Sequence, residues 1–151
     1  MKGFLASVAM GFSLLSMPAW AADKGSADEA VAMVKKAAAM IKAEGKEKAF
    51  AAFADAGNKD FHDRDLYVFV YDLNGVNLAH GNNPKMVGKN LLELKDQEGK
   101  PLIRQMVDVA KTKGKGWVDY KWPNPVTKAI EAKSSYVEKV DDMLVGSGIY
   151  K

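Results

Sequence analysis

The chain contains no cysteine, which excludes disulfide bonds, thiolate catalysis and c-type haem attachment. Histidine is scarce as well, because only His62 and His80 occur and they lie far apart in the sequence. Asp63 and Asp65 are acidic residues near His62, but one histidine with nearby carboxylates and no cysteine is a weak indication of a metal site. We therefore expect no bound metal and a fold that depends on its hydrophobic core alone.

Motifs for catalysis and for cofactor binding are also missing. The chain has no H-E-x-x-H, G-x-S-x-G or G-x-G-x-x-G pattern. The segment Gly81–Asn90, GNNPKMVGKN, contains Gly-Lys, but it has the wrong spacing for a phosphate loop and no Ser or Thr to hold magnesium. We expect no catalytic residue, no cofactor and no enzymatic activity.

A strong excess of either charge is absent. Lys and Arg number 22, Asp and Glu number 19, and the formal net charge is +3 at pH 7. A nearly balanced chain does not indicate nucleic acid or an anionic membrane surface as a partner.

Long apolar runs are rare, and the clearest one stands at the start of the chain. Lys2 is followed by GFLASVAMGFSLLSM, Pro18 and the small-residue pattern Ala19-Trp20-Ala21, which together are typical of a secretory signal peptide. We predict a signal peptide over residues 1–22, cleaved near Ala21 or Ala22, and a single periplasmic domain over residues 23–151. The alternative is a retained membrane anchor, although the apolar run is short for a span.

The first part of that domain shows two helices and a hairpin in its pattern. Ser26 and Glu29 have the spacing of a capping box, and an alanine-rich amphipathic helix follows them up to Gly45. A second short helix is expected to end near Gly57. The stretch 65–81, DLYVFVYDLNGVNLAHG, alternates in the manner of a strand, turns at Gly75 and continues as a second strand.

The second part of the domain predicts one more helix and three strands. Pro101 suits the first turn of a helix that ends at Gly114, and strands are expected over 117–122, 130–140 and 143–150. Gly146 and Gly148 indicate that another part of the molecule approaches the last strand closely. Helices followed by runs of antiparallel strands are typical of an α+β domain.

Several residues on the predicted strands combine an apolar body with a polar tip, where a core built only for stability would favour Leu, Ile and Val. They are Tyr71, His80, Trp117, Tyr120, Trp122, Lys133 and Tyr136. Aromatic walls with a few convergent donors are what a small-ligand pocket requires, and a lysine among tyrosine hydroxyls suits a small carboxylate. The alternative for each aromatic residue is a place in the core, and for Lys133 a solvated face.

These residues carry a resemblance to a known family. The segments RDLYVFVYDLNGVNLAHG, NPKMVGKN, GWVDYKWPNP, KSSYVEKV and VGSGIY occur in an order and spacing that resemble the single Cache sensor domain, type 2. The resemblance covers roughly Ser26 to Lys151. It implies a long N-terminal helix packed on a PAS-like antiparallel sheet, and binding of a small organic acid such as acetate, propionate, pyruvate or lactate.

The resemblance also implies a site and a partner. Its pocket is expected to be walled by Phe69, Tyr71, Trp117, Tyr120 and Trp122, with Lys133 and His80 as candidates for the carboxylate and Tyr136 nearby. Family members usually form the sensing part of chemoreceptors and histidine kinases. Because the chain stops at Lys151, we expect a stand-alone domain that acts with such a membrane partner. The alternative is an interaction module without a small ligand, which forms a homodimer through its N-terminal helix or docks on a receptor.

Overall fold

A computed structural model describes residues 24–151, so the signal peptide predicted over residues 1–22 lies outside the described residues. The helical elements are α1 (Ala27–Glu44), α2 (Lys46–Ala54), the 3-10 turn η2 (Pro84–Met86) and α3 (Leu102–Lys113). The strands are β1 (His62–Asp63), β2 (Leu66–Tyr67), β3 (Phe69–Asp72), β4 (Asn77–His80), β5 (Lys115–Pro123), β6 (Ile130–Val140) and β7 (Met143–Tyr150).

Five strands form one antiparallel sheet in the order β4-β3-β7-β6-β5. The α+β class and the predicted PAS-like sheet with its long N-terminal helix are therefore confirmed. One detail of the hairpin differs from the sequence pattern. Leu66 and Tyr67 pair with β1 in a separate two-stranded ribbon, and the sheet strand begins only at Phe69.

The first helix begins at the predicted capping box. The Ser26 hydroxyl accepts a hydrogen bond from the Glu29 amide, and the Glu29 carboxylate accepts one from the Ser26 amide, which satisfies two donors that a helix start leaves free. Just before α1, the Gly25 amide donates a 2.7 Å hydrogen bond to the carboxylate of the buried Asp65. This bond fixes the start of α1 to the beginning of β2.

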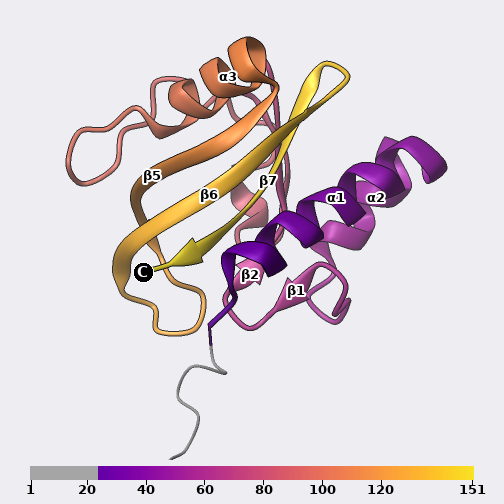
Figure 1. Cartoon of the computed structure of the whole chain (residues 1–151), viewed down its shortest axis with the longest axis horizontal. Coiled ribbons are helices and arrows are strands. Elements are labelled where there is room, and N and C mark those ends of the chain that lie inside the picture. Colours follow the sequence, from indigo (N-terminus) through magenta and orange to yellow (C-terminus); the bar gives the residue numbers. More distant parts are fainter. Residues whose placement is uncertain (1–23) are drawn as a thin grey trace, which may run out of the picture.

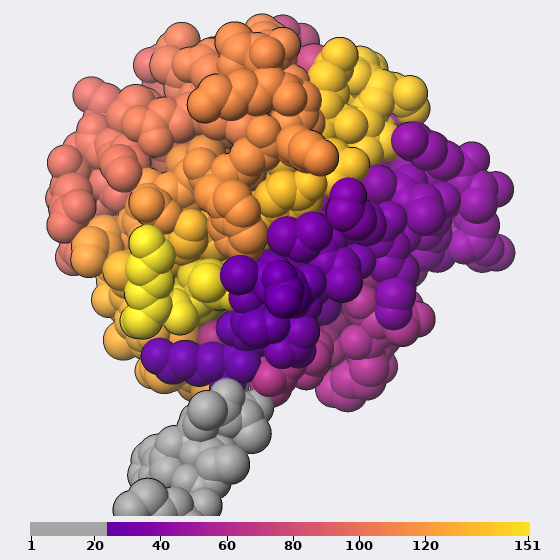
Figure 2. All heavy atoms as spheres, in the orientation of Figure 1, coloured from indigo at the N-terminus to yellow at the C-terminus, as the bar shows by residue number. Residues whose placement is uncertain are grey.

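The two faces of the sheet carry different helices. Figure 1 shows α3 at one side of the long strands and the α1–α2 pair at the other. In Figure 2 the indigo α1 lies directly against the yellow and orange strands. The α1 face is filled by aliphatic residues such as Val34, Val70 and Val145. The α3 face is filled by aromatic residues of the strands together with Leu102, Ile103 and Met106 of α3.

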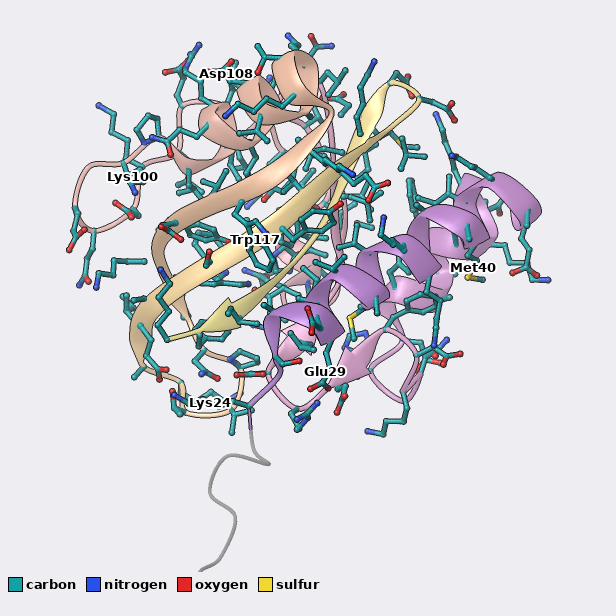
Figure 3. All side chains as sticks on the ribbon, in the orientation of Figure 1. Lys24, Glu29, Met40, Lys100, Asp108 and Trp117 are labelled. Carbon is teal, nitrogen blue, oxygen red and sulfur yellow. The ribbon has the colours of Figure 1, made fainter. Side chains whose placement is uncertain are left out.

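The edge strand β5 has side-chain partners on its open side. The Lys100 ammonium donates a 2.6 Å hydrogen bond to the Asp119 carbonyl, and the Asp96 carboxylate accepts a 2.9 Å bond from the Lys121 amide. Lys100 lies in the loop beside β5 (Figure 3). Covering an edge in this way hinders pairing with another chain. Within residues 24–151, no helix combines the length and the apolar character that a membrane span requires.

Candidate ligand-binding site

A cavity lies between α3 and the sheet. Strand alternation points one set of side chains toward α3, and α3 supplies the opposite wall. The cavity is lined by Tyr67, Phe69, Tyr71, His80, Leu102, Ile103, Met106, Tyr120 and Trp122. It therefore has aromatic walls on the strand side and an aliphatic wall on the helix side.

The cavity is narrow in this conformation. The space between its lining atoms is about 200 Å³, part of it open to solvent, and the centre of a water molecule can occupy only about 10 Å³ of it. That is room for roughly one water molecule. A larger ligand therefore requires the side chains around the cavity to move apart.

Lys133 of β6 is the cation of this region, and it is buried to a degree that is rare for lysine. Only 1% of the residue is exposed. Its ammonium donates a 2.9 Å hydrogen bond to the Tyr67 hydroxyl. It also lies 4.2 Å from the centre of the Tyr67 ring, 5.1 Å from that of Tyr150, 5.7 Å from that of Phe69 and 5.9 Å from that of Tyr120. Aromatic faces attract a cation, but they replace the lost water only in part.

In the part of the chain that the structure describes, the Lys133 ammonium has no anionic partner in contact with it. Among residues 24–151, no carboxylate oxygen lies within 4.0 Å of its nitrogen. Burial lowers the pKa of Lys133 to about 7, and the charge of Asp65 opposes this shift only in part. A buried ammonium without a counter-ion is costly, so the site is electrostatically suited to an added anion.

His80 of β4 lies beside the same cavity as a neutral ring. Burial, and next the charge of Lys133, lower the pKa of His80 to about 3. Its Nδ1 accepts hydrogen bonds from the amides of Asn82 at 3.2 Å and Asn83 at 2.9 Å. Because Nδ1 acts as an acceptor in a neutral ring, the proton is placed on Nε2. That N–H makes no hydrogen bond within the described residues and remains available as a donor.

The tyrosine hydroxyls around Lys133 stay protonated. Burial raises the pKa of Tyr67 and of Tyr120 well above the usual range, and it raises the pKa of Tyr150 as well. The Tyr120 hydroxyl pairs with the Ser135 hydroxyl at 2.7 Å, and the Tyr150 hydroxyl donates to the Pro123 carbonyl at 2.7 Å. The hydroxyls are thus neutral groups that hold Lys133 and the ends of the strands in position.

Two glycines of β7 make room for this arrangement. A Cβ on Gly148 would lie 2.2 Å from the Ser135 hydroxyl oxygen and 2.8 Å from the Lys133 Cε, and a Cβ on Gly146 would lie 2.3 Å from the Phe69 ring. All three distances are shorter than van der Waals contact allows. The close approach predicted at these glycines is confirmed. The side chains of Lys133 and Phe69 occupy the space that the missing Cβ atoms leave.

Six of the eight residues predicted to form the site are brought together. Phe69, Tyr71, His80, Tyr120 and Trp122 line the cavity, and Lys133 is in contact with its aromatic walls. The expectation that Lys133 lies on a solvated face, left open as an alternative, is wrong for this fold because the residue is buried.

Trp117 and Tyr136 do not belong to this group, and their prediction as part of the same pocket is corrected. They pair with each other across β5 and β6, with ring centres 5.5 Å apart, on the α1 side of the sheet. Figure 3 labels Trp117, which is 42% exposed. Successive strand residues alternate between faces, so Trp117 and Tyr136 point away from Tyr120 and Lys133.

Tyr67 and Tyr150 were missed as site residues, as was the wall formed by Leu102, Ile103 and Met106 of α3. The sequence held a signal for both tyrosines. Tyr67 shares its alternation with Phe69 and Tyr71, and Tyr150 shares its face with Gly146 and Gly148. No comparable signal exists for the α3 residues, because their spacing indicates only a buried helix face.

Part of this chain is similar in sequence to parts of two longer bacterial proteins. Methyl-accepting chemotaxis protein McpP of Pseudomonas putida is 33% identical over 91 residues, which cover 59% of this chain and 17% of that protein. Sensor histidine kinase MctS of Rhizobium johnstonii is 38% identical over 89 residues, which cover 58% of this chain and 19% of that protein. The match thus spans less than a fifth of the length of these curated relatives.

Solved structures show the same fold. The crystal structure of a methyl-accepting chemotaxis protein from Vibrio parahaemolyticus has a TM-score of 0.70 at 28% identity, covering 82% of this chain and 86% of that chain. A Cache chemosensory domain whose structure is described as a basis for carboxylic acid recognition has a TM-score of 0.64 at 26% identity, covering 78% and 83%. Residues 4–151 match the profile described as Single Cache domain 2, and the chain belongs to this family of sensor domains.

Proposed function

We propose that this protein is an extracytoplasmic sensor domain that binds a small carboxylate in the cavity beside Lys133. One observation carries the proposal. The Lys133 ammonium is buried against an aromatic cavity and has no carboxylate within 4.0 Å among the described residues. A bound carboxylate supplies the missing counter-charge through a charge-assisted hydrogen bond.

The lining gives the ligand an orientation. Its carboxylate faces Lys133 and accepts a second hydrogen bond from the Nε2–H of His80. Its short apolar tail faces Leu102, Ile103 and Met106, the aliphatic wall of the cavity. Acetate, propionate, pyruvate and lactate have this combination of one carboxylate and a small body. Binding, rather than turnover, is the function that these residues support, because none of them forms a nucleophile–base pair.

The relatives support a sensing role. They are a methyl-accepting chemotaxis protein and a sensor histidine kinase, and one structural neighbour is described as recognising carboxylic acids. Another neighbour is described as a periplasmic sensor domain. Together with the signal peptide predicted over residues 1–22, they support a periplasmic location and a histidine kinase or chemoreceptor as membrane partner.

Two loops connect the cavity to the surface. His80 accepts hydrogen bonds from the amides of Asn82 and Asn83, at the start of the loop that leads into η2. Tyr150, which faces Lys133, donates to the carbonyl of Pro123, at the start of the loop between β5 and β6. A ligand that moves His80 and Tyr150 shifts the conformations that these loops populate, which is what a partner can detect.

Thermal shift and titration calorimetry with acetate, propionate, pyruvate and lactate test the proposal. A ligand that binds only the folded state raises the melting temperature by mass action. We expect at least one of these acids to do so, and Lys133→Met to weaken its binding by roughly 10- to 100-fold, the range for a charged hydrogen bond. Tyr136→Phe, on the other face of the sheet, is the matched control. Absence of binding, or full binding by a folded Lys133→Met variant, would refute the proposal.

A protein-interaction role is the second candidate, and the exposed Trp117 favours it. This ring is 42% exposed on β5 and lies beside Tyr136, next to the strands that α1 packs on. Such a face suits a homodimer that includes α1, or docking on a receptor. Sedimentation at increasing concentration distinguishes the candidates. A dimer that Trp117→Ala dissociates, with no response to any acid, would favour the interaction module.

A further inference from the structure

The ammonium of Lys133 in the proposed site is surrounded by aromatic rings. Three strands and the segment before β2 surround it, and each contributes a titratable side chain. Tyr67 of β2, Tyr120 of β5 and Tyr150 of β7 present rings within 6 Å of the ammonium, and the Tyr67 hydroxyl accepts its hydrogen bond. Burial raises the pKa of all three tyrosines, so they remain uncharged up to alkaline pH.

Tyr71 of β3, His80 of β4 and Asp65 are further ionisable groups around this pocket, and burial raises the pKa of Tyr71 as it does for the other tyrosines. The pKa of His80 is lowered to about 3, so its ring stays neutral between pH 6 and 9. Within residues 24–151, the Asp65 carboxylate is the one anion whose charge acts on Lys133, and it lies more than 4.0 Å away with one oxygen bonded to the Gly25 amide. Leu102, Ile103 and Met106 of α3 carry no charge. Lys133 is thus the group in the described pocket that changes charge near neutral pH.

We propose that the pocket binds its carboxylate together with a proton on Lys133, so that the strength of ligand binding depends on pH. This inference rests on the proposed function. The ligand enters as the anion, the amine of Lys133 takes a proton from the solvent, and an ion pair forms in a cavity that was nearly neutral. The net transfer is equivalent to that of the undissociated acid, which avoids burying an uncompensated charge.

The direction of the effect follows from linkage. In the free protein the pKa of Lys133 is about 7, because burial disfavours the ammonium. A carboxylate in contact with the ammonium stabilises it and raises that pKa. Below pH 7 the lysine is already protonated and binding needs no proton. Above pH 7 each ligand brings about one proton with it, and the apparent affinity falls nearly tenfold per pH unit until the pKa of the complex is reached.

The same geometry favours ligands that carry a single negative charge. The pocket offers one cation, so a monocarboxylate becomes neutral when it binds, whereas a dicarboxylate leaves a second buried carboxylate without a partner. Small monocarboxylates are therefore the ligand class whose single negative charge is neutralised by the one proton on Lys133.

Isothermal titration calorimetry on the purified protein with sodium propionate and with sodium acetate tests this inference. Titrations at pH 6 and pH 8.5, each in two buffers of different ionisation enthalpy, give both the affinity and the number of protons taken up. We expect the dissociation constant to be about 30-fold higher at pH 8.5 than at pH 6. We expect uptake of about one proton per ligand at pH 8.5 and nearly none at pH 6.

Each outcome has a distinct meaning. Equal affinities at the two pH values, with no dependence on the buffer, would overturn the proton linkage and leave carboxylate binding intact. If acetate, propionate, pyruvate and lactate all fail to bind at pH 6, the proposed function itself is overturned. Lys133→Arg, whose guanidinium stays charged, is expected to bind weakly at both pH values without a pH slope. A slope that survives in this variant or in a binding-competent Lys133→Met variant would assign the proton to another group. Tyr136→Phe is expected to keep the wild-type slope.

Discussion

The two faces of the sheet are built for different purposes. The face under α1 and α2 is a mainly apolar core in which Val34, Val70 and Val145 are fully buried beside Phe53 and Phe61. The face under α3 buries Lys133, His80 and several tyrosine hydroxyls around a narrow cavity. Both faces belong to the same strands, since one residue points to α1 and the next to α3.

The difference shows how one domain separates stability from recognition. Aliphatic burial on the α1 face contributes stability without polar costs. The α3 face carries a buried lysine that contacts no counter-ion among residues 24–151, a feature that destabilises the free protein and favours an added anion. Substitutions on the two faces are therefore expected to act on different quantities.

The largest expected effect lies on the α1 face. Phe53 of α2 is 0% exposed and packs edge-to-face on Phe61, with ring centres 4.8 Å apart. We expect Phe53→Ala to lower the free energy of unfolding by about 3–5 kcal/mol, because it leaves a cavity in a closed core. Urea unfolding measures this loss, and calorimetry on the folded fraction should give unchanged propionate affinity. A loss below about 1 kcal/mol would show that this face is not the main source of stability.

The next effect concerns Lys133 and depends on pH. Its folded-state pKa of about 7 lies below the ordinary value of 10.5, so between these values the unfolded chain binds more protons than the folded one. Stability of the free protein therefore rises with pH, by roughly 2 kcal/mol between pH 7 and pH 9. Lys133→Met removes this contribution and should be at least as stable as the wild type at pH 7. Urea unfolding of both proteins at the two pH values decides the matter, since parallel behaviour would mean that Lys133 is not the titrating group.

His80 is expected to have a smaller effect that links the cavity to its loop. His80→Phe keeps an aromatic ring beside Tyr67 but removes the Nε2–H donor and the acceptor for the Asn82 and Asn83 amides. We expect propionate affinity to fall about tenfold, consistent with one lost hydrogen bond. Hydrogen exchange of the two amides should become faster. If affinity falls while exchange is unchanged, His80 contacts the ligand without controlling the loop.

The smallest effect is expected for Tyr136. Its hydroxyl donates a 2.7 Å hydrogen bond to Glu138, on the side of the sheet opposite to the cavity. Tyr136→Phe should cost about 1 kcal/mol of stability and change propionate affinity by less than about twofold. Urea unfolding and calorimetry measure the two quantities. A tenfold loss of affinity would mean that a substitution on the α1 face also changes ligand binding. The two faces would then not serve stability and recognition separately.

Much of the secondary structure could be predicted because its causes are local. The Ser26–Glu29 capping box, the positive φ of Gly75 and the proline at the end of β5 each act within a few residues. The start of the sheet strand could not be located in this way. Whether Leu66 and Tyr67 pair with β1 or with the main sheet depends on how the chain folds back after α2, which no local pattern specifies.

The candidate site was predictable in its residue types but not in its membership. Alternation indicates that Trp117 and Tyr120 point to opposite faces, yet it does not indicate which face α3 covers. Trp117 and Tyr136 were grouped with Lys133 by residue type and by the family resemblance, although they lie on the α1 side. Tyr150 was overlooked although it shares its face with Gly146 and Gly148, and its place opposite Lys133 becomes visible only in the pairing of β6 with β7.

The amino-acid sequence by itself determined most helices and strands, the absence of thiol chemistry and the supply of aromatic and basic side chains, because these depend on residue identity and short-range geometry. Only the tertiary structure decided that Lys133 is buried and that Gly148 leaves it space. It also decided which aromatic rings surround the ammonium. Lys133 is buried because β2, β5, β6 and β7 pack against one another around it. Its lowered pKa and its affinity for an anion both follow from that burial, so they are properties of the assembled sheet.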